Sequence, residues 1–563
     1  MTNEKTFDAI VVGSGISGGW VAKELTERGL RVLMLERGPD VPHGTGYKTE
    51  HVPVYDFKYR LLGDKRRYLT ENAVQRSHPF FNEATEHFFV NDRDNPYTTA
   101  NGKPFTWIRG HQVGGRSLTW GRQSYRMSAL NFEENKLDGH GVDWPIRYDD
   151  LAPWYDHVER FIGLSGSPLG NPMSPDGIYQ PPYPMNMAER DFQARVQRAF
   201  PDRQVTMART ANLTRQLNDD RMPCHYCGPC ERGCSAGAYF STQSSTLPAA
   251  KKTGRLTMVP DSIVRKIIVD ENAGRATGVE VLDAQSRAVT TYQARMVFLC
   301  ASALESVRLL MLSATTAQPS GIANSSGLLG RYVMDHHLSD LAIARIPAPQ
   351  RRHFTGYRPT ALHIPRFRNA GKRDSSFLRG YQLNAGASLD DWWRGAAMPG
   401  IGADFKNALR RTGDWSLMLA AQGECLPRLD NRVSLNPSVR DKWGIPVLHM
   451  DVSWGDNDKA MRKEAGDTCV DMLKQAGYKD VVRVPVESIP GAMIHEMGGA
   501  AMGRDRKSAV LDRYNRTFDY PNLFVTDGAA MSSSSSANPS LTYMALSARA
   551  AAFAADEFKA GRL

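Results

Sequence analysis

The stretch FDAIVVGSGISGGWVAKELTERGLRVLMLERG, residues 7–38, decides the fold. Its apolar run over residues 7–12 is bounded by glycine and predicts a buried strand. A G-x-G-x-x-G motif follows, formed by Gly13, Gly15 and Gly18. Helical spacing then continues to Gly29, and a second apolar run ends at Glu36. Strand, glycine motif, helix, strand and terminal acid in this order predict a dinucleotide-binding unit.

Each residue of this unit has a mechanical task. The first glycine permits a tight turn, the second lets a pyrophosphate approach the backbone, and the third lets the helix pack on the sheet. The pyrophosphate would lie at the helix N-terminus, and Glu36 would accept hydrogen bonds from a ribose. Residues 15–19, GISGG, also match the G-x-S-x-G nucleophile elbow of hydrolases. That alternative leaves Gly13 and Glu36 without a role, so the dinucleotide interpretation is favoured.

The other end of the chain favours FAD over NAD. Residues 520–531, YPNLFVTDGAAM, predict a second strand and turn with Asp527 and Gly528 at its tip. An N-terminal dinucleotide fold that is closed by a C-terminal strand and helix suits an extended FAD. A nicotinamide enzyme would not need this second half.

Length and charge limit the classes of function. A chain of 563 residues exceeds one compact core and predicts two domains. The net charge of +10 comes from scattered residues, which favours a solvated basic surface, with a docking face for an acidic protein as the alternative. No basic helix or aromatic-basic alternation indicates nucleic acid. The start, MTNEKTFDAIVVG, lacks the features of a signal peptide, and no apolar run is long enough to span a membrane.

Six further segments carry a family resemblance. They are RGHQVGGRSLTWGRQSYR (109–126), VFLCASALESVRLLMLS (297–313), NSSGLLGRYVMDHH (324–337), LDNRVSLNP (429–437), IHEMGGAAMG (494–503) and SSANPSLTYMALSARAA (535–551). Together with the two chain ends, and in this order, they resemble the glucose–methanol–choline (GMC) oxidoreductase family of flavoproteins. In that family the first segment passes over the flavin, the fourth resembles a strand of the substrate-binding sheet, and the last two carry the catalytic pair.

The resemblance implies an α/β fold (α+β overall), with a Rossmann-like FAD-binding domain and a second domain built on an antiparallel sheet with helices. The expected boundaries are 1–345 for the FAD-binding domain, 346–484 for the substrate-binding domain and 485–563 for a C-terminal return. The expected cofactor-binding residues are Gly13, Gly15, Gly18, Glu36, Gly114, Gly115, Thr119, Trp120, Val264, Asp527 and Gly528. In the similar pyranose oxidases a histidine bonds covalently to the flavin. Thr119 stands at that position here, so we expect non-covalent FAD.

The catalytic pair is carried over from the family's His/Asn pattern. Oxidation of an alcohol by a flavin needs a base for the hydroxyl proton and a group that orients the oxygen. His495 is the expected base, since imidazole titrates near neutral pH, and Asn538 is the expected donor to the substrate oxygen. There is an alternative for each residue. A lone histidine is often structural, and an asparagine before a proline, such as Asn538, often serves to cap or initiate a turn. The HEMGG sequence also begins like a zinc-protease helix, but the second histidine is missing.

The substrate region is less legible. Residues 346–484 are expected to form a sheet that roofs the reactive face of the flavin. Trp392 and Trp393 could stack on a sugar ring, although a core role is favoured. By resemblance, His336 and His337 lie near the flavin, with no role that follows from the sequence.

Four of the seven cysteines gather in MPCHYCGPCERGCSAGAYFS, residues 222–241. The metal-ligand candidates, in C-x2-C-x2-C-x3-C spacing, are Cys224, Cys227, Cys230 and Cys234. This spacing is that of bacterial iron–sulfur ferredoxins, whereas zinc sites usually use two separated pairs. An iron–sulfur cluster, 4Fe-4S or 3Fe-4S, is favoured over zinc, disulfides or free thiols. Ser235 stands where a ferredoxin has proline, and no second ligand set is present, so the number of cysteine ligands stays open.

These features predict an FAD-dependent dehydrogenase of GMC type. The resemblance implies oxidation of a secondary hydroxyl of a sugar or glycoside to a ketone, as in glucoside 3-dehydrogenases, with electrons leaving through the cluster. It also implies a small subunit and a cytochrome c-type acceptor. Alternatives are a gluconate or keto-gluconate 2-dehydrogenase, a pyranose oxidase that uses oxygen, and a non-enzymatic flavin and iron–sulfur redox sensor. The expected location is cytoplasmic by sequence, or periplasmic by co-export with a signal-bearing subunit.

Overall fold

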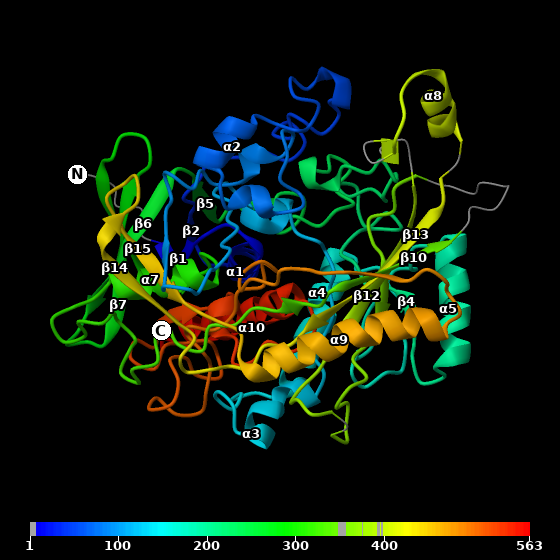
Figure 1. The fold of residues 1–563 in the computed structure, drawn as a ribbon. Coiled ribbons are helices and arrows are strands. Elements are labelled where there is room, and N and C mark those ends of the chain that lie inside the picture. The colour runs from blue at the N-terminus through cyan, green and yellow to red at the C-terminus, as the bar shows by residue number, and fades with distance from the viewer. Residues whose placement is uncertain (1–6, 347–355, 374, 391–393, 396–397, 412) are drawn as a thin grey trace.

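The computed structural model describes residues 7–346, 356–373, 375–390, 394–395, 398–411 and 413–563. Trp392 and Trp393 lie outside the described residues. Two large sheets lie side by side, each with helices packed on it, and the N- and C-terminal parts of the chain meet at the first of them (Figure 1).

The cofactor sheet has the order β5-β2-β1-β8-β7-β6, with β17 beside β8. Strands β5, β2, β1, β8 and β17 run parallel, and β7 and β6 continue the sheet antiparallel. The bounds are β5 Leu256–Val259, β2 Val32–Leu35, β1 Phe7–Val12, β8 Val289–Leu299, β17 Leu523–Val525, β7 Arg275–Asp283 and β6 Ser262–Asp270. β2 and β17 are buried throughout because parallel strands are covered on both faces. This sheet confirms the Rossmann-like prediction.

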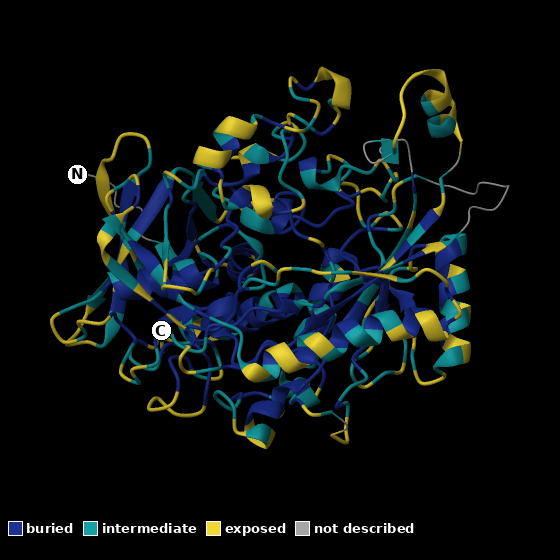
Figure 2. Ribbon diagram, in the orientation of Figure 1, coloured by how far each residue is buried: buried dark blue, intermediate teal, exposed yellow. Residues whose placement is uncertain are grey.

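Helix α1 (Ile16–Glu27) packs closely on α10 (Ser540–Lys559) beside the cofactor sheet. Small residues permit this approach, because α10 buries a row of alanines that includes Ala551 and Ala555. Helix α7 (Ala303–Leu312) packs on β6, and α4 (Tyr148–Ile162) packs on α10. Figure 2 shows that the buried residues concentrate in these inner helices and strands. Shorter helices in the described chain are α2 Lys65–Glu71, α3 Glu134–Asp138, α6 Thr246–Lys252 and α8 Gly402–Arg410.

The substrate sheet is antiparallel and confirms the predicted second sheet. Its order is β16-β10-β13-β12-β11-β4, with β9 beside β13. Helices α9 (Asp456–Gln475) and α5 (Met187–Ala199) pack against this sheet, and their apolar residues share a core with those of its strands. The strand bounds are β16 Val482–Val484, β10 Leu341–Ile346, β13 Trp415–Gly423, β12 Tyr381–Leu389, β11 Leu362–Ile364, β4 Thr206–Met207 and β9 His337–Leu338.

The two faces of this sheet differ because side chains alternate along a strand. On β12, Leu383 and Ala385 belong to the core that the helices complete. Gln382 and Asn384 therefore lie on the opposite face, where Gln382 contacts Asn538. The polar face is thus turned toward the C-terminal segment that carries the candidate catalytic residues.

A small third sheet corrects one expectation. Strand β14 (Arg432–Arg440) was expected in the substrate-binding sheet, but it pairs with β15 (Pro446–Asp451), which pairs with β3 (Thr98–Thr99). The physical reason is packing: Val433 is buried in the core cluster that contains Met311 of α7. The strand therefore covers the cofactor domain.

The chain enters the substrate sheet several times. β4 comes from residues 206–207 and β9 from residues 337–338, while β10 to β13 and β16 follow. No helix within the described ranges is both long and apolar enough to cross a membrane.

Candidate active site

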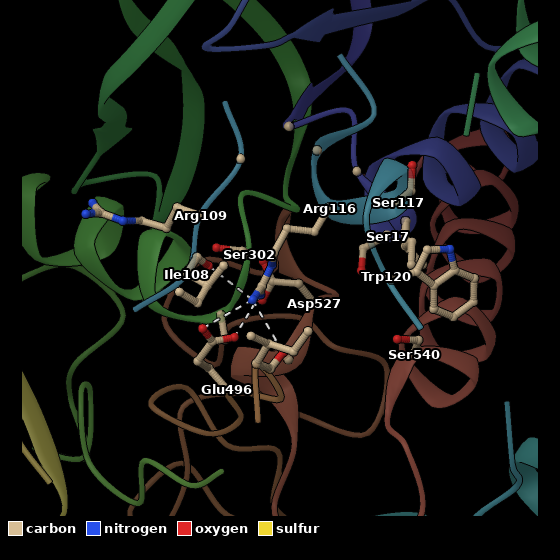
Figure 3. Close-up of a pocket in the computed structure, with 18 of the residues that line it drawn as sticks. Ser17, Ile108, Arg109, Arg116, Ser117, Trp120, Ser302, Glu496, Asp527 and Ser540 are labelled. Atoms are coloured by element: carbon tan, nitrogen blue, oxygen red, sulfur yellow. Dashed lines mark hydrogen bonds and ion pairs between the residues drawn. The ribbon is translucent and has the colours of Figure 1, made fainter. Parts of the chain in front are cut away.

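A cavity of about 480 Å³ lies between the cofactor sheet and the polar face of the substrate sheet. Its walls come from the first glycine loop, the second glycine segment, the start of β6, the start of α7 and the C-terminal segments (Figure 3). The predicted residues that line it are Gly13, Gly15, Glu36, Gly115, Thr119, Trp120, Val264, His495, Asp527, Gly528 and Asn538. Gly18 and Gly114 lie just behind the wall.

The first glycine loop is shaped by close backbone contacts. Gly13 has a φ of +96°, and a Cβ there would lie 2.5 Å from the carbonyl oxygen of Cys300. A Cβ on Gly18 would collide with the carbonyl oxygen of Gly13. Gly15 has nothing within 4 Å of an added Cβ, and it caps α1 without a side-chain hydrogen bond. The loop therefore leaves open space at a helix N-terminus, which fits a pyrophosphate.

Glu36 closes the end of β2, where a ribose is expected. Its carboxylate accepts hydrogen bonds from the Ser14 backbone N–H at 3.0 Å, the Ser14 hydroxyl at 2.6 Å and the Gly38 N–H at 3.1 Å. Burial raises the pKa of Glu36, and these donors oppose that shift. Ser14 thus links Glu36 to the glycine loop, a contact that the sequence did not indicate.

The second glycine segment crosses the cavity opposite the first loop. A Cβ on Gly115 would meet only the Cα of Gly15, at 3.6 Å, so the two backbones approach each other closely. Gly114 has a φ of +90°, and any Cβ there would collide with the Gln243 side chain. Trp120 is anchored by a hydrogen bond from its indole nitrogen to the Phe240 carbonyl oxygen at 3.0 Å.

A partly buried ion pair ties this segment to the C-terminal part of the chain. Arg116 donates to both carboxylate oxygens of Glu496, at 3.2 and 2.8 Å (Figure 3). Burial acts to lower the pKa of Arg116, but Glu496 raises it above its usual value. Asp527 lies nearby in the same view, and its carboxylate accepts from the Ala529 N–H at 3.0 Å. The pair fixes the residue next to His495.

His495 and Asn538 come together at the wall of the cavity. The Nε2 atom of His495 lies 3.4 Å from the Nδ2 atom of Asn538. The other ring nitrogen, Nδ1, lies 2.9 Å from Nδ1 of His336, whose Nε2 lies 2.7 Å from the Ser535 carbonyl oxygen. His336 is fully buried, and burial lowers its pKa to about 4. Burial, His336 and Arg116 also hold the pKa of His495 well below the usual histidine value.

These contacts fix the tautomer of His495. A carbonyl oxygen only accepts, so His336 carries its proton on Nε2 and presents an unprotonated Nδ1. His495 must then donate from Nδ1, because two lone pairs cannot bond to each other. Its Nε2 is left as an unprotonated nitrogen that faces Asn538, as a general base requires.

Two glutamines orient Asn538. Its Oδ1 accepts from Nε2 of Gln382 at 3.0 Å and lies 3.5 Å from Nε2 of Gln422. The amide NH₂ is therefore turned toward His495, where it could donate to an oxygen held between them. Asp335 supports the base from behind, since its carboxylate accepts the backbone N–H groups of Gly491, Met493 and His495.

The cysteine-rich loop lies beside the same cavity. Arg122 lines the cavity and is close enough to Cys230 for the thiol to affect the pKa of the arginine. Gly228, Gly233 and Gly237 all have positive φ, as the tight loop requires. Burial raises the pKa of Cys230 to about 11. Across the described part of the chain, no three His, Cys, Asp or Glu side chains form a group that could hold a metal, so the cluster stays a prediction.

Two family models match most of the chain. The N-terminal model of GMC oxidoreductase matches residues 7–338, and the C-terminal model matches residues 427–547. The chain belongs to the GMC oxidoreductase family. It is an FAD-dependent oxidoreductase that acts on CH–OH groups, and the open glycine loop and Glu36 fit that cofactor.

Individual GMC relatives are distant in sequence but match over nine tenths or more of both chains. The chain is 27% identical to the fructose dehydrogenase large subunit of Gluconobacter japonicus, with 100% of both chains covered. It is 25% identical to the gluconate 2-dehydrogenase flavoprotein of Pantoea cypripedii, over 95% of this chain and 91% of the relative. The fold is also similar to that of the formate oxidase of Aspergillus oryzae, with a TM-score of 0.63, 16% identity and 100% of both chains covered.

Proposed function

We propose that this GMC oxidoreductase is a dehydrogenase that oxidises a secondary hydroxyl of a sugar or glycoside, at C3, to a ketone, with FAD bound non-covalently. The observation that carries the proposal is the convergence of His495 Nε2 and Asn538 Nδ2 at the cavity wall. Relatives named as sugar and sugar-acid dehydrogenases support the substrate class. Thr119, in place of a histidine, supports non-covalent binding.

The chain's own residues divide the chemistry between them. The NH₂ group of Asn538 donates to the substrate oxygen and orients it. The unprotonated Nε2 of His495 takes the hydroxyl proton, because His336 keeps the proton of the imidazole on Nδ1. FAD, when bound, accepts the hydride that leaves the same carbon. The alcohol thus loses one proton and one hydride and becomes a ketone.

Product analysis tests this function. The purified protein with bound FAD is given methyl β-D-glucopyranoside and either an artificial dye or oxygen as the acceptor. The proposal expects a 3-keto glycoside and turnover that depends on the dye. A product oxidised at C2, or turnover with gluconate and not with the glycoside, would instead support the gluconate 2-dehydrogenase alternative that the relatives suggest. Rapid turnover with oxygen and little dye reduction would show an oxidase.

We also propose that the cysteine-rich loop binds an iron–sulfur cluster through Cys224, Cys227, Cys230 and Cys234. Support comes from their spacing, from the glycines that turn the loop and from the nearness of Cys230 to Arg122 at the cavity. Such a cluster would supply one-electron transfer toward a small subunit and a cytochrome c-type acceptor. Iron and sulfide analysis with electron paramagnetic resonance of anaerobically purified protein tests this. Zinc without iron, or no metal at all, would contradict it.

A further inference from the structure

Two carboxamides in the cavity wall are left without hydrogen-bond partners. The Oε1 atom of Gln123 and the Oδ1 atom of Asn384 are buried, and neither accepts a hydrogen bond from any described residue. Buried polar atoms are satisfied in the great majority of cases, and each exception calls for an explanation. Because both side chains line the cavity, a half-turn of the terminal amide would present the unsatisfied oxygen to a ligand that brings its own donors.

The two amides share the cavity with the catalytic pair. Asn384 lies two residues after Gln382 on β12, on the same face of the strand. Since Gln382 bonds to Asn538, the side chain of Asn384 lies about 7 Å farther along the sheet from that contact. Gln123 lies on the segment that pairs with Thr210 and lines the same cavity. Both amides therefore line the cavity that contains the His495 and Asn538 pair, and Asn384 lies on the strand face that reaches Asn538.

The other two amides of the wall already have partners. Asn538 accepts from Gln382, and Gln422 donates to the Ser536 carbonyl oxygen at 2.9 Å. Asn538 is thus oriented with its NH₂ group toward the reacting oxygen, and the amide NH₂ of Gln422 is engaged by the main chain, so neither group is left to bind a neighbouring hydroxyl. Gln123 and Asn384 differ because the side-chain oxygen of each lacks a partner among the described residues.

We propose that Gln123 and Asn384 bind the hydroxyls that flank the reacting carbon, and so restrict this site to substrates with vicinal hydroxyls. The inference deepens the proposed function and rests on it. A carboxamide offers one acceptor and two donors, and each hydroxyl both donates and accepts, so the two match. A site with buried polar groups rejects an analogue that lacks the matching hydroxyl, because those groups would stay unpaired.

The test compares two secondary alcohols in three variants. Methyl β-D-glucopyranoside carries flanking hydroxyls, and cyclohexanol carries none. The variants are Asn384→Leu, Gln123→Met and, as a matched control, Gln285→Met on an exposed turn. The ratio of kcat/KM for the glycoside to that for cyclohexanol should fall at least about tenfold in Asn384→Leu and Gln123→Met, mainly through KM. It should stay unchanged in Gln285→Met, and the absorption spectrum of bound FAD reports folding.

A binding measurement separates this inference from the proposed function. Calorimetric titration of methyl β-D-glucopyranoside into His495→Ala, with and without Asn384→Leu, measures recognition without turnover. Weaker binding in the double variant supports the inference even if no glycoside is oxidised. If the wild type oxidises the glycoside while both amide variants keep the wild-type ratio and affinity, the inference is overturned and the proposed function stands.

Discussion

At the scale of single residues, the decisive feature is the chain of contacts from the Ser535 carbonyl oxygen through His336 to His495. A carbonyl oxygen at one end sets the tautomer of both rings, and the free Nε2 of His495 meets Asn538 at the other end. His336 does not itself line the cavity and acts through His495, so it is a positioning residue.

Replacing His336 tests this arrangement. In His336→Ala the preference of His495 for the Nδ1–H tautomer is lost, and we expect kcat to fall at least about tenfold while FAD stays bound. His336→Gln keeps an acceptor for His495 and should restore part of the rate. Steady-state kinetics and the flavin spectrum of both variants measure this. An equal loss of kcat in the two variants, or no loss of kcat in either, would argue that His336 has only a packing role.

The lowered pKa of His495 predicts a one-sided pH profile. The base acts only when it is unprotonated, and burial holds its pKa well below the usual value of 6.5. The active form is therefore complete at neutral pH and is lost only as the pH falls through the lowered pKa. The kcat/KM for the glycoside should be flat from about pH 6.5 to 8 and should decline at more acid pH. An acid limb centred above pH 7 would show that His495 is not the base in this form.

At the scale of elements, the alternation along β12 organises the site. Odd residues such as Leu383 pack into the core against the helices, and even residues such as Gln382 face the catalytic segment. The sequence YQLNAGASL contains this alternation, and the polar face could have been predicted from it. The partner of each polar residue could not, because Asn538 comes from a segment more than 150 residues away.

Gln382→Leu tests the element's role in orienting Asn538. The substitution leaves Oδ1 of Asn538 with only the longer contact to Gln422, so the amide can rotate away from the substrate oxygen. We expect kcat to fall about tenfold or more, in line with the roughly 1–3 kcal/mol cost of an unsatisfied buried group. Gln382→Asn keeps an amide donor on a shorter side chain, so its kcat should lie between those of the wild type and Gln382→Leu. Single-turnover reduction of the bound flavin measures the effect, and unchanged rates in both variants would contradict it.

At the scale of the whole molecule, the two ends of the chain build one cofactor domain. The N-terminal half of this domain could be predicted from the order of strand, G-x-G-x-x-G motif, helix and acid, because the local sequence pattern alone determines that unit. The location of β14 could not be predicted in this way. Its sequence fits any half-buried strand, and packing on α7 assigns it to the third sheet.

The Arg116 and Glu496 pair is expected to stabilise this assembly. Glu496→Gln would leave Arg116, whose side chain is 28% exposed, without its counter-charge, which should lower the free energy of unfolding by somewhat less than the roughly 3–5 kcal/mol that breaking a fully buried pair costs. The exposed Arg160 and Asp156 pair is a suitable control, since Arg160→Ala should cost about 1 kcal/mol or less. Denaturant unfolding of the FAD-bound proteins compares the two. A similar small loss in both variants would mean that the partly buried pair contributes little.

Anaerobic reduction of the bound flavin by methyl β-D-glucopyranoside tests the central claim most directly. Stopped-flow absorbance near 450 nm follows the bleaching of FAD in the wild type and in His495→Ala, with equal FAD content in both. The wild type should bleach, and the variant should bleach at least about a hundredfold more slowly. Bleaching of His495→Ala at the wild-type rate, or a wild type that no glycoside reduces, would contradict the account.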